Sequence, residues 1–169
     1  MNAVLDTAIL ISAALAIQRD TMSSSRRLFE RGVCRDGFDI VTSEPMLREL
    51  SDVLSRPNFA LPVSFAIDFV ERIALAAVIV RIQGLAMGCR DARDDKVLET
   101  ALNANADFLV ARDRDLHEPS ARCALEKVGL GIRDRPIRVV SVRAFADALD
   151  GPRFSPLVFA AAGELHPFT

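Results

Sequence analysis

The 169-residue chain has the length of one ordinary domain, and about two-thirds of its unfolded surface can be buried in a single core. Its net charge of −2 excludes a strongly basic protein that holds nucleic acid by its overall field, so any such contact must be local. Three widely spaced cysteines without a Cys-x-x-Cys pair argue against a zinc knuckle and a disulfide framework.

The predicted elements alternate between strands and helices. Strands are expected at residues 2–5, 38–41, 77–82, 107–111 and 136–142, and helices at 7–16, 26–30, 65–76, 96–104 and 143–149, with another helix between Ser43 and Arg56 and a short one within 118–135. Thr7 and Ser43 are expected to cap the helices that follow them, and Ser23–Ser25 offer caps for the helix at 26–30. This alternation predicts a parallel sheet with helices on both faces.

Half of the residues are hydrophobic, which is a high share for a monomer of this size. A surface shared with a partner would explain it, and we expect a homo-oligomer, most simply a homodimer. No uninterrupted apolar run reaches the ~20 residues needed to span a bilayer. The apolar N-terminal stretch contains Asp6 and has no Lys or Arg ahead of it, unlike a signal peptide. We therefore expect a cytoplasmic protein with no membrane contact.

Acidic side chains follow the predicted strands or begin the predicted helices at four places: Asp6, Glu49, Asp95 and Asp113. The ends of parallel strands are where α/β proteins carry out chemistry. Four converging carboxylates would repel one another unless a cation neutralised them. Carboxylate oxygens favour hard divalent ions, so the pattern predicts a site for Mg²⁺ or Mn²⁺.

Arginine residues recur beside these acids, at Arg90, Arg93, Arg112 and Arg114. Guanidinium groups can grip phosphates as forks, which predicts local contacts with nucleic acid; the alternative is solvated loop charge. The chain has ten Phe but no Trp or Tyr, so base-stacking side chains are scarce. We expect recognition to depend on phosphate charge and to weaken with added salt.

Several stretches in a fixed order resemble the PIN domain, a family of metal-dependent ribonucleases that includes the toxins of many bacterial toxin–antitoxin pairs. They are residues 4–13, 43–57, 90–102 and 106–116, followed by Val139–Val142 and Phe145. The resemblance covers residues 2–149 and is greatest with the toxin branch. It implies an α/β fold, a three-layer α/β/α sandwich with a central, mainly parallel sheet, for a domain at 1–149. Residues 150–169 are then a tail that is either disordered or packed on a partner.

The resemblance also implies roles for individual residues. By position, Asp6, Glu49, Asp95 and Asp113 match the catalytic, metal-binding acids of the family, and Asp115 is a candidate outer ligand. The implied activity is hydrolysis of RNA phosphodiester bonds with Mg²⁺ or Mn²⁺, leaving 5′-phosphate and 3′-hydroxyl ends. The implied partners are an RNA substrate and an antitoxin protein.

Two departures from the family pattern leave an alternative open. The chain has Ala8 where the family usually has Asn, and Ala111-Arg112 where it usually has Thr-Gly. Loss of such orienting groups commonly costs about 10–100-fold in metal affinity or activity. The alternative is a non-catalytic PIN-like scaffold that acts as a protein-binding module. A phosphatase of the haloacid dehalogenase type is disfavoured, because it needs an acid at the position of Ala8.

Each acid also has a structural interpretation. Asp6 would cap the helix that follows it, and Asp95 would be favoured by the helix dipole. Glu49 would extend to solvent from a face that carries Leu47 and Leu50. Asp113 and Asp115 would be turn residues. For each acid, the structural interpretation is an alternative to its role in the metal site.

Overall fold

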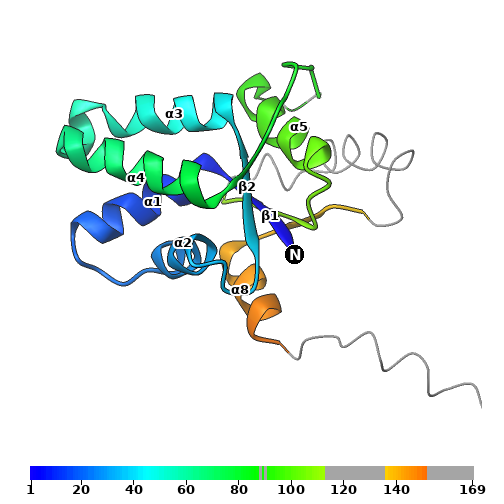
Figure 1. The fold of residues 1–169 in the computed structure, drawn as a ribbon, viewed down its shortest axis with the longest axis horizontal. Coiled ribbons are helices and arrows are strands. Elements are labelled where there is room, and N and C mark those ends of the chain that lie inside the picture. The colour runs from blue at the N-terminus through cyan, green and yellow to red at the C-terminus, as the bar shows by residue number, and fades with distance from the viewer. Residues whose placement is uncertain (88, 90, 113–135, 152–169) are drawn as a thin grey trace, which may run out of the picture.

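The computed structural model describes residues 1–87, 89, 91–112 and 136–151. Within them, five strands form one sheet in the order β3-β2-β1-β4-β5, and all neighbouring strands are parallel. The strands are β1 (Asn2–Leu5), β2 (Asp39–Ser43), β3 (Val78–Val80), β4 (Phe108–Val110) and β5 (Arg138–Val140). This confirms the parallel sheet of an α/β/α sandwich (Figure 1).

The described helices overlap the predicted ones throughout. They are α1 (Thr7–Gln18), α2 (Ser24–Val33), α3 (Glu44–Leu54), α4 (Val63–Ala76), α5 (Asp95–Asn103) and α8 (Val142–Asp150), with 3₁₀ turns η1 (Pro57–Phe59) and η2 (Ala92–Asp94). The helix expected within 118–135 and the tail beyond Gly151 lie outside the described residues. Among the described helices, none combines the length and the apolar character needed to cross a bilayer.

Strand periodicity sets the two outer layers. Successive side chains of β1 point to opposite faces of the sheet, so Ala3 and Leu5 pack in one core and Val4 packs in the other. The first core also contains residues of α1, α2, α3, α4 and α8. The second contains Val97 and Leu98 of α5. Helices therefore cover both faces of the sheet, with α5 on one side and α1, α2, α4 and α8 on the other.

Aromatic packing fixes α8 against the sheet. The Phe145 ring is fully buried, with its centroid 5.1 Å from that of Phe38 and 4.9 Å from that of Phe108. Such edge and tilted ring pairs add about 0.5–1.5 kcal/mol to the free energy gained by burying their area. The last described helix is thus an integral part of the domain and holds its own N-terminus near the end of β5.

The strand order creates a topological switch point between β1 and β4. From β1 the chain proceeds outward through β2 to β3, and then returns to the other side of β1 as β4. In open parallel sheets, ligands bind outside the carboxyl ends of the strands at such a point. Asp6 directly follows β1, and Ala111-Arg112 directly follows β4. Both strand ends that border the switch point therefore carry residues singled out in the sequence.

Candidate active site at the carboxyl ends of the strands

Asp6 lies at the junction of β1 and α1. The residue is 7% exposed, and its backbone N–H donates to the Val110 carbonyl at 2.9 Å, which ties the ends of β1 and β4 together. Asp6 occupies the N-cap position of α1, but its side chain makes no capping hydrogen bond. The structural interpretation of Asp6 as a side-chain cap is therefore wrong, and so is the expected capping by Thr7, which is the first residue within the helix.

Asp95 is the first residue of α5 and is 9% exposed. One carboxylate oxygen, Oδ1, accepts the backbone N–H of Cys89 at 2.9 Å. Asp95 is therefore more than a residue favoured by the helix dipole, because its side chain fastens the segment that precedes the helix. The same hydrogen bond orients the carboxylate.

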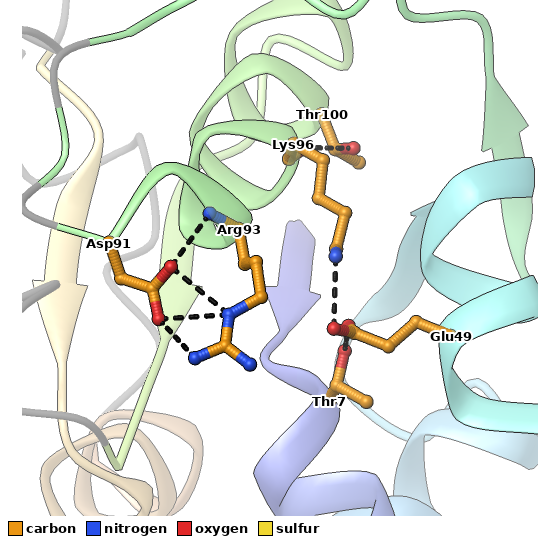
Figure 2. A network of polar contacts seen from close by, with 6 residues as sticks. All are labelled: Thr7, Glu49, Asp91, Arg93, Lys96 and Thr100. Carbon is orange, nitrogen blue, oxygen red and sulfur yellow. Dashed lines mark hydrogen bonds and ion pairs between the residues drawn. The ribbon is translucent and has the colours of Figure 1, made fainter. Parts of the chain in front are cut away.

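Glu49 of α3 joins the starts of two other helices. Its Oε2 accepts the Thr7 hydroxyl of α1 at 2.8 Å, and its Oε1 accepts the Lys96 ammonium of α5 at 2.9 Å. Figure 2 shows the Glu49 side chain extending from α3 to a position between these two residues. We call Thr7, Glu49 and Lys96 the Glu49 junction. Because Thr7 follows Asp6 and Lys96 follows Asp95, the junction connects the three elements that carry these predicted acids.

Glu99 of α5 makes a second set of contacts that the sequence did not single out. Its side chain is buried at 1% residue exposure and accepts three consecutive backbone N–H groups: Gln83 at 2.6 Å, Gly84 at 2.9 Å and Leu85 at 3.0 Å. Gly84 has a φ of +79°, a conformation that glycine adopts without strain. We call this arrangement the Glu99 clamp. The signal that could have found it is an acid between the apolar positions of α5.

Thr100 supports α5 from one turn further along. Its hydroxyl contacts the Ser43 hydroxyl at 2.8 Å and donates to the Lys96 carbonyl at 2.7 Å. Ser43 does occupy the N-cap position of α3, as predicted, but its side chain makes no capping bond. Its hydroxyl instead connects the end of β2 to α5.

Arg93, a predicted phosphate contact, is paired within its own segment. Its guanidinium donates to both carboxylate oxygens of Asp91, with the closest contact at 2.7 Å, while its side chain stays 81% exposed (Figure 2). The hydrogen bonds from Arg93 lower the pKa of Asp91 to about 2, and nearby Lys96 acts in the same direction. The Asp91 carboxylate in turn raises the pKa of Arg93, with smaller contributions from Asp94 and Glu49.

The structure places some of the predicted site residues and leaves others outside the described part. Asp6, Glu49 and Asp95 come from three elements that meet at the carboxyl ends of the strands. Among residues 1–87, 89, 91–112 and 136–151, no three His, Cys, Asp or Glu side chains form a group that could hold one ion. Arg112 donates to the Ser12 hydroxyl at 2.6 Å. The predicted residues outside the described part are Arg90, Asp113, Arg114 and Asp115.

A comparison with known families identifies the class of this fold and site. Residues 2–115, well over half of the chain, match the PIN domain, and the chain belongs to the PIN domain family. PIN domains are generally nucleases that bind RNA and use divalent metal ions. No curated protein and no solved structure matches the chain.

Proposed function

We propose that this protein is a divalent-metal-dependent endoribonuclease. The observation that carries the proposal is the Glu49 junction, which connects the start of α1 after Asp6 with the start of α5 after Asp95. The junction lies at the carboxyl ends of the strands, where the fold has its switch point. The proposed ligands are Asp6, Glu49, Asp95 and Asp113, with Asp115 as an outer ligand.

The donor chemistry fits the ion that the family uses. The described donors are carboxylate oxygens, which suit Mg²⁺ or Mn²⁺ rather than softer metals. When bound, such an ion supplies an activated water and withdraws charge from the phosphate. Within the chain, the Cys89 amide orients Asp95, and Lys96 offsets the negative charge of Glu49. These contacts reduce the repulsion between acids before an ion arrives.

We further propose that the chain is the toxin of a toxin–antitoxin pair and forms a homodimer. The resemblance to the toxin branch supports the first part. Exposed apolar side chains on α4 and on the edge strand β3 support a protein partner: Val63, Ile67, Leu75, Val78 and Ile79. An apolar surface of this kind is typical of a protein–protein contact.

A non-catalytic scaffold is the second candidate. It is favoured by the engagement of both Glu49 oxygens, one by Thr7 and one by Lys96, which leaves this carboxylate already neutralised. A metal titration separates the two candidates. At a Mn²⁺ concentration of 100 times the Kd, binding to a nuclease site raises the free energy of unfolding by about 2.7 kcal/mol, whereas a scaffold without the site gains none. Thermal unfolding with and without Mn²⁺ measures this difference.

The decisive experiment replaces Asp6 with Asn. Labelled single-stranded RNA is incubated with the wild type and with Asp6→Asn, in Mn²⁺ and in EDTA. We expect EDTA-sensitive cleavage by the wild type and a loss of at least about 100-fold in the variant, because removing a ligand carboxylate costs more than removing an orienting group. Asp68→Asn, an exposed acid on α4, is the matched control. Undiminished cleavage by Asp6→Asn would overturn the proposal.

A further inference from the structure

A cavity lies beside the carboxyl end of β4, which borders the switch point. Its volume is about 500 Å³, and its described lining comes from α1, the start of α2, the end of β4 and the start of α8. Five serine hydroxyls and two guanidinium groups line it, with no acid among the described lining residues. Figure 1 shows α2 and α8 close together beside the sheet, and these two helices pack against each other. The lining therefore combines donors with positive charge.

Ser25 places a hydroxyl with an available proton in the cavity. The residue is only 7% exposed and still lines the cavity. Its hydroxyl forms no hydrogen bond within the described part of the chain, and its oxygen is not among the fully enclosed polar atoms that lack a partner there. The hydroxyl is therefore open to the cavity and can donate to a ligand that accepts its proton.

The other four hydroxyls are those of Ser12, which is fully used, of Ser23 and Ser141, which can still donate, and of Ser24, which forms no hydrogen bond within the described residues. Ser12 accepts from Arg112 and donates to the Ala8 carbonyl. Ser23 and Ser141 each accept a backbone N–H as helix caps, at 3.1 Å and 3.2 Å, which uses an oxygen lone pair and leaves the hydroxyl proton free. The cavity can thus present several hydroxyl protons to one acceptor.

The two arginines supply the charge. Arg143 is exposed at the first turn of α8 and forms no ion pair with an acid of the described residues. Arg112 donates to the Ser12 hydroxyl and likewise has no acidic partner within the described part of the chain. An unpaired guanidinium pair beside free hydroxyls is suited to a phosphate group.

The geometry points to this cavity as a subsite for a backbone phosphate of single-stranded RNA, next to the phosphate that is cleaved. This assignment rests on the proposed nuclease function for its substrate. Ser12 lies six residues after Asp6 on α1, on the order of 9 Å along the helix axis. Arg112 directly precedes Asp113 in the sequence. A strand held at Arg112 and Arg143 is thereby directed toward the acids.

Binding of a labelled single-stranded RNA in EDTA tests the subsite without cleavage. We expect Arg143→Gln to weaken affinity about tenfold and to reduce the slope of log K against log salt by about 0.7, the value for one phosphate contact. The control is Arg56→Gln. Arg56 is exposed just after α3, does not line the cavity, and its substitution should change neither quantity.

Ser25→Ala gives a second and independent readout. We expect a loss of about three- to tenfold in RNA affinity with no fall in the thermal midpoint, because the hydroxyl has no hydrogen-bond partner among the described residues to lose. A hydroxyl with a purely structural role would instead lower the midpoint and leave RNA affinity unchanged. That outcome would overturn the role of Ser25 in the subsite.

Two further measurements distinguish RNA from inorganic phosphate as the ligand, and the subsite proposal from the nuclease proposal. If wild type and Arg143→Gln have equal RNA affinity and equal salt slope, the subsite is overturned. It is also overturned if Arg143 is needed for binding inorganic phosphate but not for binding RNA, since the ligand is then free phosphate. Cleavage is measured separately with wild type and Asp6→Asn. If cleavage does not depend on Asp6 while RNA affinity depends on Arg143, the nuclease proposal fails and the RNA subsite stands.

Discussion

Two glutamates, Glu49 and Glu99, lie among apolar residues of α3 and α5 and have partners of different kinds. The Glu99 clamp consists of three backbone amides, which the fold holds in place, and the residue is 1% exposed. In the Glu49 junction both partners are side chains, and Glu49 is 30% exposed at its side chain. Backbone partners cannot leave without local unfolding, whereas a hydroxyl and an ammonium can rotate away. The difference marks the contacts of Glu99 as structural, whereas those of Glu49 can be exchanged, as the proposed metal site requires.

The electrostatics of the two regions point the same way. At the clamp, the amides form charge-assisted hydrogen bonds to a carboxylate that is removed from water, so each bond is strong and costly to lose. At the junction, the Lys96 and Glu49 side chains are 21% and 30% exposed, so water still reaches the pair and offsets part of what its separation would cost. The clamp therefore supports the segment that leads to Asp91 and Asp95, while the junction stabilises the fold less than the clamp does.

The largest expected effect is on activity, in Glu49→Gln. Loss of a ligand carboxylate should reduce Mn²⁺-dependent RNA cleavage at least about 100-fold. The free energy of unfolding should change by less than about 1 kcal/mol, because the amide oxygen still accepts one of the two donors. Cleavage rates and urea unfolding measure the two quantities, with Glu71→Gln, an exposed glutamate on α4, as the matched control.

The next effect is on stability, in Glu99→Gln. The amide group cannot accept at both ends, so at least one buried backbone N–H loses its partner at a cost of about 1–3 kcal/mol. We expect the urea midpoint to fall accordingly, with Glu71→Gln again unchanged. The comparison would be refuted if Glu99→Gln kept full stability while Glu49→Gln lost several kcal/mol.

The smallest expected effect concerns the titration of Asp91 beside the site. Its pKa is lowered from 3.8 to about 2 by the hydrogen bonds from Arg93, so the pair favours the folded state above pH 3.8 and loses this contribution as the pH falls toward 2. An NMR titration of the Asp91 carboxyl should give a midpoint near 2. In Arg93→Gln we expect the midpoint to return toward 3.8. An unchanged midpoint would show that Arg93 is not its main partner.

Local sequence signals were sufficient for most of the fold. The capping serine at Ser23 was expected, and its hydroxyl does accept the Arg26 amide at the start of α2. The strand expected at 77–82 is shorter, Val78–Val80, and lies at the sheet edge, where it has a ladder partner on one side only. Composition and periodicity report burial and local conformation, but they do not report how many neighbours a strand has.

The candidate site was predicted only as a set of positions. Asp6 and Asp95 were expected at the end of a strand and the start of a helix, and both lie there. Thr7 and Ser43 were expected to cap helices, but their hydroxyls contact Glu49 and Thr100 instead. A hydroxyl at a helix start can bond locally or across the fold, and the distant partner is invisible to a local pattern.

The sequence by itself determined the order of strands and helices, and it placed acids at the strand ends, because both follow from periodicity and from residue preferences within a few positions. Only the tertiary structure decided that Glu49 contacts Thr7 and Lys96, that Glu99 holds the amides of a loop, and that the Ser25 hydroxyl faces a cavity. Those contacts join residues that are far apart in the chain. Their free energies depend on burial and on partner geometry, which exist only once the chain has folded.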